Sequence, residues 1–170
     1  VAQWKIGDKV CALLAGGGYA ETVVCPASHV LPIPAGFSFE QAAALPEVFA
    51  TAFLNIYMEA HTQPGQTVLL HAGASGVGTA AIQLCQALGN PVFVTVGDQH
   101  KLDTCLRLGA SAGHLRTGGD FESAVKAWAG SEGVHTILDP VGGNYLEQNI
   151  RLLASDGHLV IIGLMGGRSA

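Results

Sequence analysis

The residues with the clearest chemical meaning lie between positions 73 and 78, which read Gly-Ala-Ser-Gly-Val-Gly. They follow the apolar run Val68–Leu70 and precede a segment, residues 77–88, that predicts a helix. Glycines let backbone N–H groups approach a phosphate closely, and the positive end of a helix dipole favours the same anion. The pattern therefore predicts a dinucleotide pyrophosphate site at Gly73, Ala74, Ser75, Gly76, Val77 and Gly78.

The spacing of this turn departs from the usual G-x-G-x-x-G. Ser75 stands where the second glycine would be, and Gly76 follows it. Turns of this kind also occur as plain connections between a strand and a helix. On the turn alone, that simpler interpretation stays open.

The segments after the turn alternate between strand and helix patterns. Short β-branched or apolar runs predict strands, and apolar residues at helical spacing predict the helices between them. The predicted strands are 68–70, 92–96, 112–115, 134–138 and 159–162, and the predicted helices are 77–88, 99–108, 121–129 (capped by Asp120) and 144–154. This rhythm predicts an α/β fold with a doubly wound, Rossmann-type parallel sheet, whose phosphate turn follows its first strand.

The end of the second predicted strand bears on the choice of cofactor. An NAD site places an acidic residue there to bind the ribose hydroxyls, whereas this chain has Val96 and Gly97. Lys101 and Arg116 offer positive charge for the 2′-phosphate of NADPH, and the planar guanidinium suits phosphate well. Asp98 argues the other way, because its carboxylate repels that phosphate unless it turns away or pairs with Lys101. The sequence favours NADPH and leaves NAD open.

Composition excludes several classes of partner. The chain has 170 residues, a net charge of −5 and only 12% charged residues, with no basic patch, so nucleic acid is not expected. No apolar run reaches the roughly 20 residues that span a membrane. The four cysteines include no C-x-x-C pair, so no metal site is expected, and Cys85 and Cys105 are predicted as core residues. A reducing, cytoplasmic setting fits this cysteine usage. His71, at the end of the first strand, is interpreted as an anchor of the turn rather than a catalytic acid.

Residues 1–37 lie outside the α/β rhythm. Residues 11–14 and Tyr19–Val24 are predicted as strands, and the prolines at 26, 32 and 34 predict extended segments after them. This amount of β structure is too small for a core of its own and indicates part of a larger β domain. Ser38 is expected to cap a helix over 39–45, and Pro46 to begin a longer one that ends near residue 60.

Together these features resemble the medium-chain dehydrogenase/reductase superfamily, in its zinc-independent quinone oxidoreductase (zeta-crystallin-like) branch. The order and spacing of the matching segments carry the resemblance. They are Lys5–Val10, Gly18–Glu21, Leu31–Pro34, Gln41–Pro46, Thr51–Phe53, Gln63–Gly65, His71–Gly78, Leu108–Ala110, Asp139–Gly143 and Gly157 with Ile162–Gly163. Members of that family are about twice as long, so the resemblance implies a truncated chain.

The resemblance implies hydride transfer from NADPH to a small-molecule quinone or conjugated carbonyl. It implies that 1–37 are a partial GroES-like substrate-domain segment and that 38–170 are an incomplete Rossmann domain. The Gly97–Lys101 loop, including Gln99, would hold the adenosine ribose, while Asp139–Gly142 and Gly163–Met165 would lie beside the nicotinamide. No residue is assigned as catalytic. Relatives pair through the sheet edge, so a homodimer of the full-length protein is implied.

Three alternatives remain at this point. The first is an NADPH-binding protein without turnover in this shortened form. The second is an enoyl reductase of the same superfamily, which differs only in its acceptor. The third is a zinc-dependent alcohol dehydrogenase, whose Cys, His and Glu ligands residues 1–37 do not offer.

Overall fold

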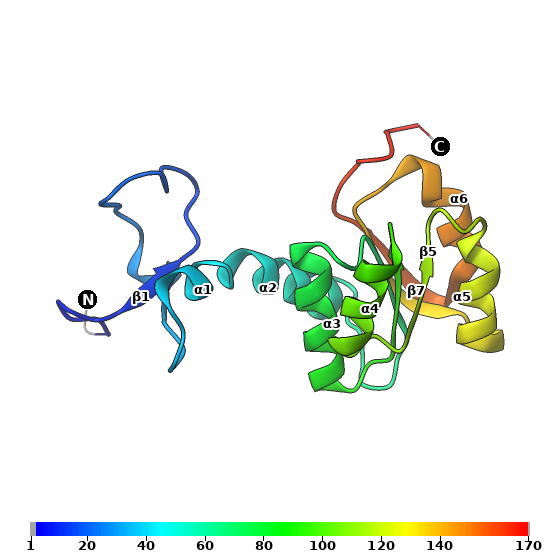
Figure 1. The fold of residues 1–170 in the computed structure, drawn as a ribbon, viewed down its shortest axis with the longest axis horizontal. Helices are drawn as coiled ribbons and strands as arrows, with labels where there is room; N and C mark the ends of the chain where they lie inside the picture. Colours follow the sequence, from blue (N-terminus) through cyan, green and yellow to red (C-terminus); the bar gives the residue numbers. More distant parts are fainter. Residues whose placement is uncertain (1–2, 170) are drawn as a thin grey trace. The chain divides into compact units, whose positions relative to one another are not determined.

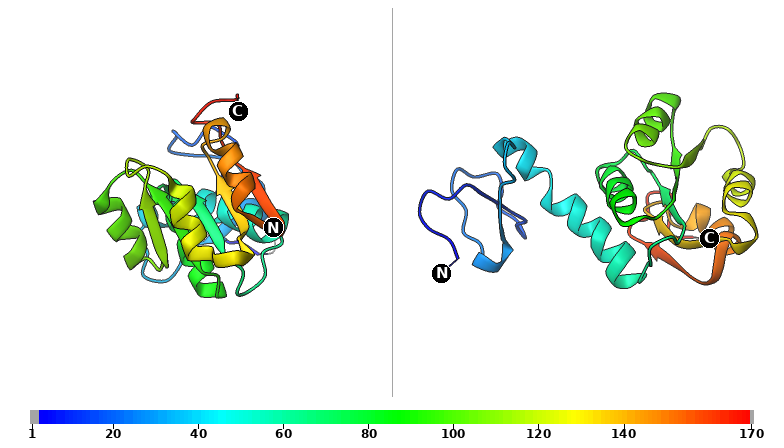
Figure 2. Two further views of the ribbon diagram at one scale, coloured as in Figure 1. Left: turned by 90° about the vertical axis from the view of Figure 1, so that its right-hand side faces the viewer. Right: turned by 90° about the horizontal axis from the view of Figure 1, so that it is seen from below.

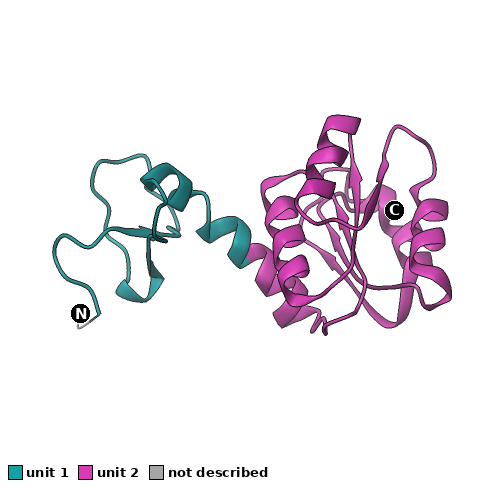
Figure 3. Ribbon diagram, turned by 60° about the horizontal axis from the view of Figure 1, so that its bottom comes forward, with its two compact units in different colours: residues 1–50 teal, residues 51–170 magenta. Residues whose placement is uncertain are grey.

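The computed structural model describes residues 3–169, so residues 1, 2 and 170 of the expected domains lie outside the described residues. The chain forms two compact units, residues 1–50 and 51–170 (Figure 3). The division falls within helix α2 (Pro46–Phe53). The assignment of residues 1–37 to a GroES-like segment and of 38–170 to a Rossmann domain stays a prediction.

The first unit contains one small antiparallel sheet. Strand β1 (Val10–Ala12) pairs with β2 (Val30–Pro32), which follows the 3₁₀ helix η1 (Ala27–His29). Helix α1 (Phe39–Ala43) begins at the predicted cap, where the Ser38 side chain accepts a hydrogen bond from the Gln41 N–H at 3.2 Å. The end of that helix lies close to its prediction.

One strand prediction in this unit is wrong. Residues 19–24 form bends and loop, and the side chains of Tyr19 and Val24 are fully exposed. Alternation stabilises a strand only where a neighbouring strand and an apolar layer receive it. Instead, β1 pairs with Val30–Pro32, in a stretch for which the prolines predicted only extended chain.

The second unit is built on a five-stranded parallel sheet of order β5-β4-β3-β6-β7 (Figure 1). Its strands are β3 (Val68–His71), β4 (Val92–Val96), β5 (Ala112–Leu115), β6 (Val134–Asp139) and β7 (Leu153–Ile161). Strands β3 and β4 are buried along their whole length, which explains their continuous apolar runs. The order reverses at β3, so the Rossmann-type α/β fold is confirmed.

Four helices connect these strands and cover both faces of the sheet (Figure 2). They are α3 (Gly76–Leu88), α4 (Gln99–Arg107), α5 (Phe121–Ala129) and α6 (Gly143–Leu152). In the right-hand view α3 and α4, in green, lie on one side, and α5 and α6, in yellow and orange, lie on the other. Cys85 and Cys105 are fully buried, as predicted.

The predicted long helix is irregular. After Phe53, α2 continues as a π-helix, η2 (Leu54–Glu59), whose Ile56 is buried. Strand β7 starts at Leu153, six residues before its prediction, and a register irregularity separates this start from the regular pairing with β6. A 3₁₀ turn, η3 (Gly130–Glu132), precedes β6. None of the described helices is long and apolar enough to cross a bilayer.

Candidate dinucleotide site

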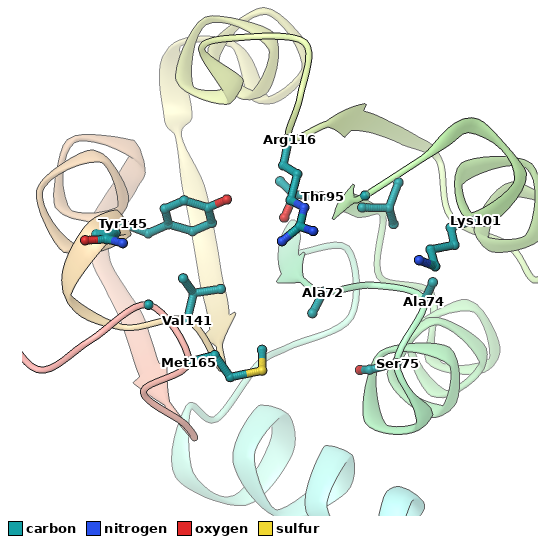
Figure 4. Close-up of a pocket in the computed structure, with 13 residues that line it drawn as sticks. Ala72, Ala74, Ser75, Thr95, Lys101, Arg116, Val141, Tyr145 and Met165 are labelled. Atoms are coloured by element: carbon teal, nitrogen blue, oxygen red, sulfur yellow. The ribbon is translucent and has the colours of Figure 1, made fainter.

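A cleft of about 590 Å³ opens at the carboxyl ends of β3, β4 and β6. In an open parallel sheet this edge, beside the reversal of strand order, is where ligands bind. The cleft lies entirely within residues 51–170. Its lining residues are Ala72, Ala74, Ser75, Thr95, Val96, Gly97, Lys101, Arg116, Val141, Asn144, Tyr145, Met165 and Gly166 (Figure 4).

The phosphate turn requires its small residues. A Cβ on Gly78 would lie 2.5 Å from the Gly73 carbonyl oxygen, and a Cβ on Gly73 would lie 2.6 Å from the Cβ of Val94. Ala72 turns the chain out of β3 in the left-handed conformation, with φ of 53°. No larger side chain fits at 73 or 78 without moving backbone or a buried strand residue.

Helix α3 begins at the turn with a polar cap. The Ser75 hydroxyl accepts a hydrogen bond from the Gly78 N–H at 3.1 Å. As at other helix starts, the first-turn N–H groups lack partners within the helix, and the dipole end is positive. Because Ser75 also lines the cleft, this helix start faces a space where an anion would be stabilised.

Two cations converge at the end of β4. A Cβ placed on Gly97 would lie 3.5 Å from Arg116 Nε and 3.8 Å from Lys101 Nζ, so both side chains pass over this glycine. Figure 4 shows Arg116 pointing into the cleft from the segment after β5. We call Lys101 and Arg116, which are both exposed, the cationic rim.

Asp98 is turned towards its own helix. Its Oδ1 accepts the Lys101 backbone N–H at 2.9 Å, capping α4, and its Oδ2 lies 3.0 Å from Lys101 Nζ. The backbone hydrogen bond from Lys101, followed by that residue's ammonium, lowers the pKa of Asp98. The carboxylate thus takes the paired arrangement that makes an acid at this position compatible with a 2′-phosphate nearby.

Beneath the cleft runs a buried chain of polar side chains. Thr95 Oγ1 lies 2.9 Å from His71 Nδ1, and His71 Nε2 lies 2.8 Å from Asn149 Oδ1. Asn149 Nδ2 donates to Asp139 Oδ2 at 3.0 Å. We call these four residues the polar chain. Their exposed fractions are 0–3%, so the hydrogen bonds form without competition from solvent.

The polar chain and its aromatic neighbours hold the His71 ring in place. Burial lowers the pKa of His71, while Asn149 and the charge of Asp139 oppose that shift. The imidazole also packs against Phe121 and Tyr145, with centroid distances of 5.1 and 4.8 Å. His71 is thus held at the end of β3 by Thr95 and Asn149, and its interpretation as an anchor of the turn stays a prediction.

Comparison with known proteins identifies the family. The Zinc-binding dehydrogenase family matches residues 76–170. The chain is 38% identical over 94% of its length to the compactin diketide synthase of Penicillium citrinum, and 36% identical over its whole length to a phenolphthiocerol synthesis polyketide synthase of Mycobacterium marinum. It covers 6% and 8% of those two proteins.

Solved structures agree with the family match. The enoyl reductase CurK superposes on 98% of the chain with a TM-score of 0.89 and 35% identity, and the chain covers 50% of it. The quinone oxidoreductase of Thermus thermophilus, solved also in its complex with NADPH, superposes on 92% with a TM-score of 0.83 and 37% identity, and the chain covers 51% of it. The chain belongs to the medium-chain dehydrogenase/reductase superfamily.

Five of the residues that the sequence proposed for a cofactor line the cleft: Ala74, Ser75, Gly97, Lys101 and Arg116. Val77 and Gly78 line an adjoining pocket of about 160 Å³ that also includes His71 and Met165. Four others line neither space. Gly73 and Gly76 belong to the turn itself, the Gln99 side chain bonds Asp103 along α4, and Gly163 packs on the Pro140 backbone. Their contact with a cofactor stays a prediction.

Sequence reasoning missed part of the cleft lining. Val141 and Met165 fall in segments predicted to lie beside the nicotinamide, but Asn144, Tyr145, Thr95 and Gly166 were not singled out. Tyr145 could have been predicted as a lining residue, because it lies in the first turn of the helix after β6, at the carboxyl edge of the sheet. Thr95 carries a weaker signal, as the polar residue in the buried run of β4.

The family name raises the question of zinc. Among residues 3–169, no group of three or more His, Cys, Asp or Glu side chains lies close enough together to hold a metal ion. The four cysteines, two buried and two half-buried, are free thiols.

Proposed function

We propose that this chain binds NADPH and forms part of an enoyl reductase, which reduces a carbon–carbon double bond conjugated to a thioester carbonyl. The observation that carries the cofactor is the convergence of Lys101 and Arg116 over Gly97, next to the glycine turn at the start of α3. Two cations at the tip of the second Rossmann strand match a ribose 2′-phosphate, which NADH lacks.

The residues present fit this group. Gly73 and Gly78 leave the close backbone approach that a pyrophosphate needs, and Ser75 faces the cleft at the helix start. Lys101 and Arg116 would hold the 2′-phosphate, and Tyr145 and Val141 offer apolar surface across the cleft. When bound, NADPH would supply the hydride for the reduction. The chain's own part is to bind, orient and shield it.

The acceptor class is inferred from the relatives. Proteins named as polyketide synthases match nearly the whole chain, and a structure named as an enoyl reductase has a TM-score of 0.89. Quinone reduction is the second candidate, because quinone oxidoreductases are also among the similar structures, one at 37% identity. A cytoplasmic location and a homodimer of the full-length protein remain part of the proposal.

Binding and turnover are tested separately on the 170-residue chain. Fluorescence titration should show tighter binding of NADPH than of NADH, and tighter NADH binding would overturn the cofactor proposal. Gly78→Ala should abolish binding, because its Cβ meets backbone oxygens at 2.5 and 2.7 Å. Gly16→Ala is the matched control, since Gly16 has open space around its Cα and lies outside the cleft.

Turnover is measured as NADPH oxidation with a crotonyl thioester and, in parallel, with phenanthrenequinone. Faster consumption with the thioester supports the enoyl reductase. Faster consumption with the quinone supports the second candidate instead. NADPH binding without turnover of either acceptor supports a chain that binds the cofactor but does not complete a reductase by itself.

A further inference from the structure

We propose that His71 and Asn149 are positioning residues for the dinucleotide cleft, acting through a hydrogen-bond chain whose direction is set by Asp139. The proposal rests on the proposed NADPH-binding function. It assigns a role to a buried histidine and a buried amide that neither the glycine turn nor the cationic rim explains. The polar chain crosses three neighbouring strands and α6, joining β4 to the turn after β6.

The direction of the chain follows from donor and acceptor chemistry. Asp139 Oδ1 accepts the backbone N–H groups of Val141 and Gly142 at 2.6 and 3.2 Å, and Oδ2 accepts the Asn149 amide. A carboxylate that accepts at both oxygens fixes which end of the Asn149 amide faces it, so the amide oxygen faces His71.

The assignment of donors and acceptors continues at the His71 imidazole. An amide oxygen only accepts, so His71 Nε2, 2.8 Å away, carries the proton. In the neutral ring Nδ1 is then an acceptor, and the Thr95 hydroxyl donates to it. Every proton in the chain is thereby assigned, and Thr95 presents its oxygen, not its hydrogen, on the cleft side.

The polar chain also holds the side of the cleft that follows β6 and β7. Asp139 fixes the turn at 140–142, whose carbonyls accept the backbone N–H groups of Met165 and Gly166 at 3.1 and 2.7 Å. Val141, Met165 and Gly166 line the cleft. The His71 ring supports Tyr145, another lining residue, from behind. Disturbing the chain would therefore move the surface against which the dinucleotide lies.

Asp139→Asn tests the direction. Its amide oxygen still accepts the two backbone N–H groups, but its NH₂ then faces the Asn149 NH₂. Asn149 must turn over, which presents a donor to His71 Nε2 and reverses the ring to the Nδ1–H tautomer. The double variant D139N/N149D places the carboxylate at position 149, next to His71 in the polar chain. All hydrogen bonds of the polar chain are then restored, with the Nε2–H tautomer as in the unsubstituted protein.

The tautomer is read from ¹⁵N chemical shifts of the imidazole, and NADPH affinity by fluorescence titration. We expect Nε2–H in the unsubstituted chain and in D139N/N149D, and Nδ1–H in D139N. We expect about a tenfold weaker NADPH affinity in D139N and recovery to within about threefold in the double variant. Thr95→Val, which removes the far end of the chain, should leave the Nε2–H tautomer in place and serves if D139N does not fold.

Several outcomes overturn the proposal. An Nδ1–H tautomer in the unsubstituted chain, no reversal in D139N, or reversal in T95V would refute the assigned direction. A reversed tautomer in D139N with unchanged NADPH affinity would refute the positioning role. Failure of the unsubstituted chain to bind NADPH would refute the proposed function, and the positioning role with it, while the tautomers would still decide the direction.

Discussion

The cleft has two kinds of polar structure, and they differ in almost every physical respect. The polar chain is buried, fully hydrogen-bonded and made from residues up to 78 positions apart. The cationic rim is exposed, and the Lys101 ammonium pairs with Asp98, three residues away. Buried hydrogen bonds hold their partners in one arrangement, whereas exposed ion pairs contribute little to stability. In the functions proposed above, the polar chain holds the geometry of the cleft and the cationic rim selects the charge of its ligand.

The largest expected effect comes from breaking the polar chain. Asn149→Leu leaves His71 Nε2 and Asp139 Oδ2 buried without partners, so we expect a loss of about 3 kcal/mol in the free energy of unfolding, since each such group costs about 1–3 kcal/mol. Urea denaturation measures it. Gln148→Leu, on the same helix but with only a 3.4 Å hydrogen bond at an exposed site, is the control and should change stability by less than about 0.5 kcal/mol. Equal losses of unfolding free energy in both variants would contradict the claim that the buried polar chain contributes more to stability than exposed hydrogen bonds.

The second effect is the pH dependence of stability. Because the folded pKa of His71 lies below its ordinary value of 6.5, the unfolded state binds a proton that the folded state excludes once the pH falls below 6.5. Stability should therefore decrease with falling pH by up to about 1.4 kcal/mol per unit, until the folded pKa is reached. NMR titration of the His71 ring checks the cause. Protonation of His71 at or above pH 6.5 in the folded chain would contradict it.

The third effect concerns the rim and should leave stability nearly unchanged. Arg116→Ala removes one of the two cations over Gly97, so NADPH should bind about tenfold more weakly, which corresponds to about 1.4 kcal/mol. NADH affinity should not change. Arg107→Ala, an exposed arginine of α4 outside the cleft, is the matched control. Equal weakening of NADPH and NADH would show that Arg116 does not read the 2′-phosphate.

The smallest effect is expected at Asp98. Asparagine caps helices as well as aspartate does, so Asp98→Asn should keep the start of α4 while it releases the Lys101 ammonium from its ion pair. NADPH should then bind about twofold more tightly in a titration at low salt, and the gain should vanish at high salt. Weaker NADPH binding in this variant would indicate that the ion pair orients Lys101.

The contrast between local contacts and contacts far apart in the sequence also explains which features could be predicted from the sequence. The glycine turn, the Ser38 and Asp120 caps and the buried strand β4 have local signals, since a few neighbouring residues determine each conformation. The cationic rim could also be predicted from the sequence, because the end of the second strand has a known place beside the ligand site in sheets of this type.

The polar chain lies beyond such reasoning. His71 was predicted as an anchor, but its partners come from β4 and α6, and only the folded register brings Thr95 beside it. Asn149 has no local feature that distinguishes it from other helical asparagines. The wrong strand prediction at 19–24 also arises from long-range contacts. Its apolar–polar alternation is a local signal, but no neighbouring strand pairs with this segment among the described residues.

Ala72 shows that backbone strain is held at the edge of the cleft. Its left-handed conformation, with φ of 53°, costs an alanine about 1–2 kcal/mol relative to glycine. Glycine would relieve that strain but lose about 0.5–1 kcal/mol through the greater freedom of its unfolded chain. The strain is the larger of the two terms, so the balance favours glycine by about 0.5–1 kcal/mol and alanine is held at a cost in stability. Because Ala72 lines the cleft, alanine there also gives the cleft surface a methyl group that glycine would lack, at a small cost in the stability of the fold.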